Sequence, residues 1–506
     1  MYNWTTGLNP EQSEAVLHVS GPLLILAGAG SGKTTVLVSR TGHILQSQDV
    51  RPSEICVLTF TNRAARSMLT GVGQLCGPYA HDVVGGTFHR VALKDLQRFA
   101  KRLGYSQSFT VIQRDDAKEL MSLLRAEEPA AKDSDSFPST ERILDMISLA
   151  LNTQTSINQV IWDKYRRYHS MSGEIEVLAR KYFERKLAMN VMDFDDLLAN
   201  WYALLNEHED VALKIQSEVK AVLVDEYQDT NMLQSRIVGL LVQPTQNITV
   251  VGDDAQSIYG FRGADVSNIL EFEKIYHNAQ VHTLFTNYRS TPQILSLANE
   301  SRRFAKEGFR KDLQSARLKG DAPVVVSCRD VNMQASFVAQ RVLELINGGV
   351  LIDDIAVLYR AHHHAMELQL ELTRRRIPFV VRLPFSEFGV EEANSDVEDD
   401  RVGKLTLSSV HQAKGLEWSH VFVIWMVEGK FPSELALREQ HGLEEERRLF
   451  YVASTRAKDA LYLVHPTAFL RSRFIEEITS IKKCQEMLTD HWVVEEEIKS
   501  EQRLSV

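Results

Sequence analysis

A glycine-rich segment near the start of the chain has the residue types and spacing of a phosphate-binding loop. Ala27–Thr35 reads Ala-Gly-Ala-Gly-Ser-Gly-Lys-Thr-Thr, and it lies between an apolar run and a helix-compatible stretch, Val36–Gln46. In such a turn the glycines let backbone N–H groups surround a phosphate at the positive end of the helix. Lys33 is predicted to reach the β- and γ-phosphates, and the Thr34 hydroxyl to bind Mg²⁺. The strict pattern has Gly in place of Ala27, so the match is relaxed there.

Two acidic residues directly after an apolar run are candidates for the remaining groups of a nucleoside triphosphatase. Asp225 and Glu226 follow Ala221–Val224, which has the composition of a buried strand. Ligands bind at the carboxyl ends of parallel strands in α/β sheets. Asp225 is predicted to hold Mg²⁺, and Glu226 to polarise the attacking water. The alternative is a pair of solvated acids, which the apolar approach disfavours.

Hydrolysis also needs positive charge on the developing γ-phosphate. Arg289, in Asn287–Ser290, and Arg456, in Thr455–Ala457, are candidates. If both reach the phosphate, the site is complete only when two parts of the chain close on it, which makes the nucleotide a switch for interdomain movement. Composition alone leaves open that both are surface arginines paired with acids such as Glu444–Glu446.

The bulk properties are those of a globular protein with several domains. The chain has 506 residues, 44% of them hydrophobic, and 67 acidic against 57 basic residues give a net charge of −10. That length is too great for one core. The acidic balance argues against a surface coated with basic charge, but it leaves room for a basic groove. Four scattered cysteines, no secretory signal pattern and no membrane-spanning run predict a cytoplasmic protein without membrane contact.

Strand-like and helix-like segments alternate over most of the chain, which predicts an α/β fold with parallel sheets. The stretch 106–192 differs, because its apolar residues recur at helical spacing and β-type runs are scarce. The strand Val281–Phe285 is expected to open a second α/β series. We divide the chain into a first lobe at 1–105 and 193–280, a helical insertion at 106–192, a second lobe at 281–382 and 404–470, an acidic linker at 383–403 and a C-terminal helical tail at 471–506.

Eleven segments together resemble the motifs of the UvrD/Rep-type DNA helicases of superfamily 1, in the family's order. The resemblance runs from about Leu8 to Val464, and in that order it is highly specific. The segments are Leu8–Gln12, Ala27–Thr35, Thr59–Ala65, Gly86–His89, Asp193–Leu198, Val224–Asp229, Gly252–Tyr259, Asn287–Ser290, Val357–Arg360, Val410–Glu417 and Glu446–Lys458.

The resemblance implies two RecA-like P-loop lobes with parallel sheets, a mostly helical insertion in the first lobe, and ATP with Mg²⁺ between the lobes. Gln12 would read the adenine, Tyr288 would lie against it, Glu417 would meet the ribose, and Gln256 would couple the γ-phosphate to DNA. The implied catalytic residues are Lys33, Asp225, Glu226, Gln256, Arg289 and Arg456. The implied ATP contacts are Gln12, Ala27, Gly28, Ala29, Gly30, Ser31, Gly32, Lys33, Thr34, Thr35, Tyr288 and Glu417, and the implied Mg²⁺ ligands are Thr34 and Asp225.

A second set of residues is implied to bind single-stranded DNA. Aromatic rings that stack on bases, beside groups that meet the backbone, hold a single strand without reading its sequence. Taken singly, each aromatic residue could equally be part of a core. The implied DNA-binding residues are Phe60, Asn62, Arg63, His89, Phe194, Tyr259, Phe261, Arg262, Arg360 and His411.

The chain departs from the family at one place in particular. Only a short acidic stretch separates Val381 from Leu405, where the family usually has a large second insertion, the 2B subdomain. The resemblance implies ATP-driven 3′-to-5′ movement on single-stranded DNA and tailed duplexes, and the missing insertion puts unaided unwinding in doubt. Two alternatives stay open: a DNA-stimulated ATPase that needs a protein partner to unwind duplex, and a nucleotide-dependent interaction switch.

Overall fold

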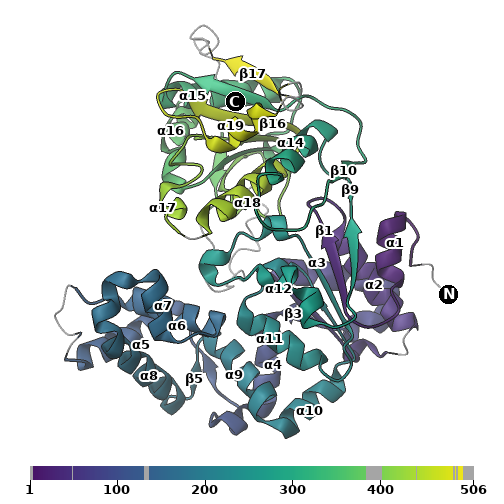
Figure 1. Ribbon diagram of the computed structural model, residues 1–506, viewed down its shortest axis with the longest axis vertical. Coiled ribbons are helices and arrows are strands. Elements are labelled where there is room, and N and C mark those ends of the chain that lie inside the picture. Colours follow the sequence, from purple (N-terminus) through teal and green to yellow (C-terminus); the bar gives the residue numbers. More distant parts are fainter. Residues whose placement is uncertain are drawn as a thin grey trace.

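The structure is a computed structural model, and it describes residues 4–47, 50–129, 131, 136–382, 402–439, 441–481, 485 and 488–493. Two parallel sheets, each covered by helices, form two lobes that lie one above the other, and a helical insertion extends sideways from the first lobe (Figure 1). The linker expected at 383–403 lies almost entirely outside the described residues. Among those that are described, no helix combines the length and the apolar character that a bilayer crossing requires.

The first lobe is built on a six-stranded parallel sheet in the order β3-β2-β6-β7-β1-β8. Its strands carry apolar side chains on both faces, because helices cover both sides of the sheet. In β1, Leu23 and Ile25 enter one core, and Leu24 and Leu26 enter the other. The strands are β1 (Leu23–Ala27), β2 (Ile55–Thr59), β3 (Val84–Thr87), β6 (Ala221–Val224), β7 (Ile248–Gly252) and β8 (Gln280–Leu284).

Helices on both faces complete the first lobe, and two of them begin directly after strands that end at the site. The Thr61 hydroxyl accepts a hydrogen bond from the N–H of Ala64, and the Thr87 hydroxyl accepts one from the N–H of Arg90, so each threonine caps its helix. The helices are α1 (Pro10–Leu17), α2 (Lys33–Ser47), α3 (Asn62–Cys76), α4 (Phe88–Phe99), α9 (Phe194–Glu207), α10 (Glu209–Glu218), α11 (Met232–Val242), α12 (Ser267–Leu270) and α13 (Phe272–Ile275).

The insertion is helical, as its spacing predicts, and it has a core of its own. A two-stranded parallel ladder brackets it, because β4 on the way in pairs with β5 on the way out. Its elements are β4 (Thr110–Val111), α5 (Arg114–Glu127), α6 (Thr140–Thr153), α7 (Ile157–Lys164), α8 (Ser172–Ala188) and β5 (Val191–Met192).

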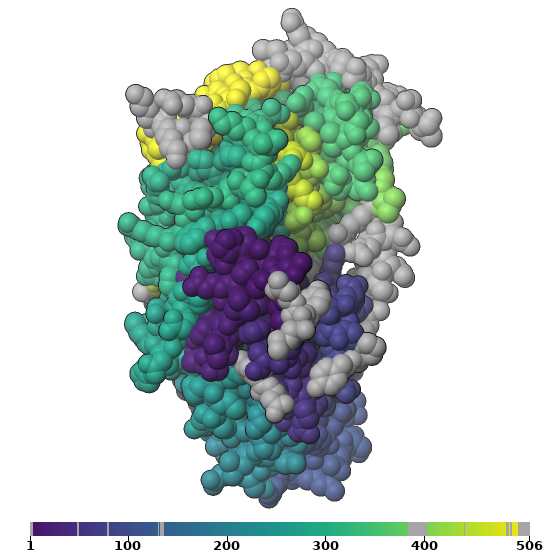
Figure 2. All heavy atoms as spheres, turned by 90° about the vertical axis from the view of Figure 1, so that its right-hand side faces the viewer, coloured from purple at the N-terminus to yellow at the C-terminus, as the bar shows by residue number. Residues whose placement is uncertain are grey.

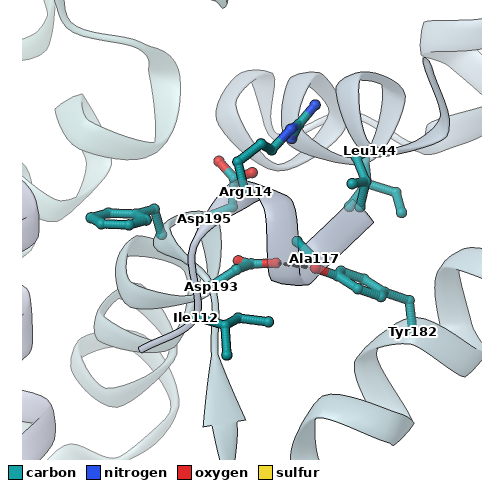
Figure 3. Close-up of a pocket in the computed structure, with 9 residues that line it drawn as sticks. Ile112, Arg114, Ala117, Leu144, Tyr182, Asp193 and Asp195 are labelled. Atoms are coloured by element: carbon teal, nitrogen blue, oxygen red, sulfur yellow. Dashed lines mark hydrogen bonds between the residues drawn. The ribbon is translucent and has the colours of Figure 1, made fainter. Parts of the chain in front are cut away.

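A buried charge cluster fixes the insertion to the first lobe. The Lys186 side chain is fully buried, and its Nζ lies 2.6 Å from Asp193 Oδ2 and 2.7 Å from Asp196 Oδ2. Figure 3 shows the Asp193 carboxylate directed at Tyr182, whose hydroxyl donates a 2.8 Å hydrogen bond to it. Asp193 also caps α9, so the same carboxylate joins α8 of the insertion to the helix that begins with Phe194.

The second lobe is a seven-stranded parallel sheet in the order β13-β14-β12-β15-β16-β11-β17. Its elements are α14 (Pro292–Arg302), β11 (Val324–Cys328), α15 (Val331–Asn347), β12 (Ile355–Tyr359), α16 (Met366–Arg374), β13 (Phe379–Val381), β14 (Leu405–Ser409), β15 (Trp418–Val423), α17 (Glu434–Leu437), α18 (Gly442–Ser454), β16 (Ala457–Pro466), α19 (Arg473–Ser480) and β17 (Thr489–Trp492). α14, α18 and α19 pack together on one face.

The structure corrects two parts of the expected division. The strand expected to open the second lobe at Val281–Phe285 is β8, which pairs in parallel with β1 from Leu23↔Gln280 to Ala27↔Leu284 and therefore completes the first sheet. An apolar strand carries no signal of the sheet it joins. The C-terminal region is not only helical, because β17 pairs with β11 and α19 is packed into the second lobe's core. The chain passes between the lobes at β9 (Thr286–Asn287), which pairs with β10 (Gln314–Ser315).

We expect Lys186→Met to destabilise the protein by about 3–5 kcal/mol, because Asp193 and Asp196 would stay buried without a cation. The control is Arg180→Met on the same helix, whose partner Glu184 lies 3.9 Å away and whose side chain is 69% exposed. That variant should change stability by less than about 1 kcal/mol. Chemical unfolding followed by circular dichroism measures both, and equal effects would contradict the assigned role of the cluster.

Candidate nucleotide and nucleic-acid site

The phosphate-binding loop has the conformation its glycines predict. Gly30 and Gly32 have φ of +66° and +82°, the left-handed region that favours glycine. Inside the loop, the Ser31 hydroxyl donates a 2.9 Å hydrogen bond to the Gly28 carbonyl. α2 begins at Lys33, so its free N–H groups lie at the loop, and a phosphate placed there meets the positive end of the helix.

The second lobe packs directly against this loop. Asn287 Nδ2 donates a 2.5 Å hydrogen bond to the Ala29 carbonyl, and the Tyr288 N–H donates a 2.9 Å hydrogen bond to the Gly30 carbonyl. A Cβ atom on Gly30 would lie 2.6 Å from Arg289 Cβ and 2.9 Å from Asn287 Nδ2. Residues of both lobes therefore meet at the position of the phosphates.

The N-terminal helix supports the loop from the other side. Gln12 Oε1 accepts a hydrogen bond from the Asn9 N–H, and Gln12 Nε2 donates a 2.9 Å hydrogen bond to the Ser31 carbonyl. Asn9 Nδ2 also donates to the Tyr288 hydroxyl across the lobes, at 3.0 Å. Figure 2 shows this N-terminal part, in purple, packed against teal parts of the chain. Gln12 thus joins α1 to the loop, and its predicted contact with adenine stays a prediction.

The acidic pair lies at the end of β6, next to Lys33. Lys33 Nζ is 2.9 Å from Glu226 Oε1, so the predicted lysine and the predicted water-orienting carboxylate form an ion pair. Glu226 has φ of +50°, an unusual conformation for a residue other than glycine, and such outliers concentrate at functional sites. The structure brings Asp225, Glu226 and Lys33 together, as their spacing predicts.

Burial and the neighbouring charges give the two carboxyl groups very different pKa values. Burial raises the pKa of Asp225 to about 7, and the charge of Glu226 adds to that shift. Burial also acts to raise the pKa of Glu226, but the cations Lys33 and Lys414 outweigh it and lower the value to about 2. Near neutral pH, Glu226 is therefore ionised, whereas Asp225 is only partly ionised, and a bound cation would favour its carboxylate form.

The donor atoms at this end of the sheet fit Mg²⁺. Magnesium in nucleotide sites is held by one or two protein oxygens together with phosphate oxygens and water. Asp225 is a buried carboxylate of raised pKa, and Thr34, exposed at the start of α2, offers a hydroxyl beside the phosphate-binding loop. The residues present therefore suit the ion named in the sequence analysis, and Asp225 and Thr34 stay its predicted protein ligands.

The two predicted arginines reach this site by different routes. Arg456 is buried, and its Nη2 donates a 3.2 Å hydrogen bond to Gln256 Oε1 of the first lobe. Arg289 pairs with Glu417, at 2.5 Å from Nε to Oε2, beside the phosphate-binding loop. Burial lowers the pKa of Arg456 to about 9, and the charge of Arg289 adds to the shift, so the guanidinium remains charged at pH 7.

Most of the predicted DNA-binding aromatic residues form one cluster. The rings of Phe60 and Tyr259 are stacked with centroids 5.2 Å apart, and Phe261 meets His411 edge-on at 5.4 Å. Arg262 lies over the rings of both Tyr259 and Phe261. The Phe261 side chain is 53% exposed, so part of the cluster is open to a nucleic-acid base. Burial lowers the pKa of His411 to about 3, which leaves its ring neutral.

The remaining predicted DNA contacts take no part in these ring contacts. His89 and Phe194 form a separate edge-on pair at 5.9 Å, at the starts of α4 and α9. Asn62 and Arg63 begin α3, directly after the end of β2. Arg360 Nε donates a 2.7 Å hydrogen bond to buried Glu446, so at least part of its guanidinium supports α18 of the second lobe.

The sequence analysis gave no role to several polar residues that hold this site together. Asn287 contacts the phosphate-binding loop, and Lys414 Nζ bonds both Asp229 and the Gln256 carbonyl across the lobes. Asn287, Lys414 and Asp229 all lie inside recognised motifs, which was the only available signal. Their partners are far away in sequence, so no local spacing reveals the contacts.

Comparison with models of known protein families shows which family the chain belongs to. The model of the UvrD/REP helicase N-terminal domain matches residues 8–277, and that of the UvrD-like helicase C-terminal domain matches residues 282–394 and 383–467. The chain belongs to the UvrD/Rep helicase family. The boundary between the two matches falls within β8, close to the point where the chain leaves the first sheet of this UvrD/Rep family member.

Individual relatives agree with this assignment. The chain is 36% identical over 379 residues to the ATP-dependent DNA helicase PcrA of Staphylococcus aureus, and 35% identical over 376 residues to the protein of the same name from Staphylococcus epidermidis. Each alignment covers 74% of this chain and 50% of the relative. The chain therefore spans about half the length of the curated relatives it matches.

We expect Gly30→Ala to destabilise the protein by roughly 1–3 kcal/mol more than Gly77→Ala. Both glycines have positive φ, +66° and +73°, so both substitutions place a Cβ in a backbone conformation that disfavours it. Only at Gly30 does the new Cβ meet Arg289 and Asn287, whereas nothing lies within 4 Å at Gly77. Thermal unfolding measures both variants, and equal shifts would show that the second lobe does not press on the loop.

Proposed function

We propose that this chain is an ATP-dependent DNA motor that moves 3′ to 5′ along single-stranded DNA and has helicase activity on tailed duplexes. The observation that carries the proposal is the composition of the phosphate site. Lys33 and Glu226 come from the first lobe, whereas Arg289 of the second lobe approaches Gly30, and Arg456 of the second lobe bonds Gln256 of the first. Hydrolysis at such a site depends on how the lobes are placed, and this couples it to their movement. Membership of the UvrD/Rep family and the two PcrA relatives support DNA as the track.

The residues of the chain suggest an order of events. A γ-phosphate brought to Lys33 competes with Glu226 for the same ammonium group, and release frees the carboxylate to orient the attacking water. The freed Glu226 carboxylate accepts a hydrogen bond from the attacking water and stabilises the positive charge that develops on it. Arg456, held by Gln256, and Arg289 neutralise charge on the transferring phosphoryl group. Mg²⁺ held by Asp225 and Thr34 would neutralise phosphate oxygens.

The aromatic cluster supports a single strand as the polymer. Rings offer stacking faces to any base, so the Phe60–Tyr259–Phe261 cluster with Arg262 suits binding without sequence preference. Tyr259 follows Gln256 by three residues, and its hydroxyl donates to the His411 carbonyl of the second lobe at 3.4 Å. A shift in the position of Gln256 would therefore move Tyr259, on which a base could stack. This arrangement suits coupling between hydrolysis and stepping.

A partner-dependent form of this function has an observation of its own. A short acidic stretch stands between β13 and β14, where the family usually has a large second insertion. We propose that duplex unwinding by this chain requires a protein partner, while ATP hydrolysis and movement on a single strand do not. Unwinding of a tailed duplex by the purified chain alone would remove this second proposal.

The first test is ATP hydrolysis with and without single-stranded DNA. We expect DNA to stimulate turnover, Lys33→Ala to abolish it because the phosphate contact is lost, and Glu226→Gln to bind ATP without hydrolysing it. Lys306→Ala, an exposed residue of the second lobe, serves as the control and should behave like the wild type. Turnover that ignores DNA would favour a nucleotide-dependent interaction switch. Duplexes with a 3′ or a 5′ tail then test the direction.

The second test addresses the aromatic cluster. We expect Tyr259→Ala and Phe261→Ala each to weaken binding to an oligothymidine by about 1–3 kcal/mol, because each removes a stacking face. Trp492→Ala is the control, since its side chain is 67% exposed on β17, at the far edge of the second sheet. Fluorescence anisotropy measures affinity. Unchanged affinity in both cluster variants would place the strand elsewhere.

A further inference from the structure

The segment between α14 and β10, residues 303–313, carries a buried lysine from the second lobe into the first. It is flanked by α14, which packs on α18 and α19 of the second lobe. Its Phe309 packs against the core of the first lobe. Two residues later, Lys311 is buried, and its Nζ lies 2.6 Å from Asp253 Oδ1 and 2.8 Å from Asp254 Oδ1.

The loop is shaped around these two carboxylates. The second oxygen of Asp254 accepts hydrogen bonds from Arg302 Nη2 at 2.8 Å and from the Phe309 N–H at 3.2 Å. At Gly308, φ is +119°, and a Cβ would lie 2.5 Å from Asp254 Oδ2. Only glycine lets the backbone turn this close to the carboxylate. The backbone is therefore shaped to enclose this contact, which is not a surface ion pair.

From Asp253 the contacts lead to the phosphate site. One oxygen of Asp253 binds Lys311, and the other accepts a 2.7 Å hydrogen bond from Gln256 Nε2. With its NH₂ group on Asp253, the Gln256 amide must turn its Oε1 the other way, where it accepts the hydrogen bond from Arg456. A buried cation thus sets the orientation of an amide, and the amide holds the guanidinium.

We propose that Lys311 is a positioning residue for phosphoryl transfer, acting through Asp253 and Gln256 on Arg456. The proposal rests on the proposed ATP hydrolysis. Separating Lys311 from two buried carboxylates would leave charges unpaired, at a cost that exceeds that of opening exposed contacts. The contact therefore keeps Gln256 beside the second lobe.

A double-mutant cycle tests the route. We expect Lys311→Met to lower the kcat for DNA-stimulated hydrolysis at least about tenfold, with KM for ATP nearly unchanged, because placement and not binding is lost. Gln256→Ala should cause a similar loss, and the double variant should be no worse than Gln256→Ala alone, because both changes break one chain of contacts. The control is Lys306→Met, an exposed lysine of the same segment, with wild-type kcat expected.

Multiplied losses in the double variant, or a normal kcat in Lys311→Met, would overturn the proposal. If Lys311→Met is unfolded at the assay temperature, Lys311→Arg replaces it in the same cycle, since it keeps the charge but displaces Asp253 with a larger group. Multiplied losses in the double variant, or a normal kcat in Lys311→Arg, would then overturn the proposal.

A second measurement needs no ATP hydrolysis and so separates this inference from the proposed function. In amide hydrogen exchange, we expect Lys311→Met to speed exchange in a peptide that spans 253–258 and in one that contains Arg456, relative to Lys306→Met. Faster exchange in both supports the route even in a chain that hydrolyses no ATP. Faster exchange at 253–258 alone, or in neither peptide, shows that the contact does not reach Arg456 and overturns the inference.

Discussion

The rest of this structure depends on charged side chains of the two lobes that are buried against each other. The segment 253–259 follows β7 of the first lobe, yet Ile258 and Tyr259 pack in the core of the second. Around it, Lys311 and Lys414 of the second lobe pair with Asp253 and Asp229 of the first. Buried ion pairs add little net stability but are costly to separate. They therefore fix which surfaces of the two lobes can face each other.

This constraint explains why the phosphate site is divided. The loop of the first lobe is preorganised by its glycines, by Gln12 and by α2. The guanidinium groups come from the second lobe, through the hydrogen bond of Arg456 to Gln256 and the close approach of Arg289 to Gly30. In the proposed mechanism, the positive charge that assists phosphoryl transfer therefore depends on where the lobes stand.

The sequence was sufficient for those parts of the site that local order determines. Lys33 is adjacent to its glycines and Glu226 to its strand, so spacing along the chain places both. Sequence reasoning failed where contacts between residues far apart in the chain determine the structure. The strand β8 is apolar whichever sheet it joins, and β17 is a short polar run, Thr-Asp-His-Trp, without a strand-like pattern. Lys311 lies far from Asp253 in the sequence, and no periodicity connects a lone lysine to its carboxylates.

The strand β8 has a consequence for how such chains can be recombined. Because it completes the first sheet, everything up to Leu284 forms one whole sheet with its cores, and the second sheet lies entirely after the short crossing at Thr286–Asn287. A chimaera joined at that crossing would inherit two intact sheets. The two parts would be compatible only if the donor of the second part supplied a lysine for the buried acids of the first. The backbone can therefore be joined at this crossing, but the buried charges restrict which partners fit.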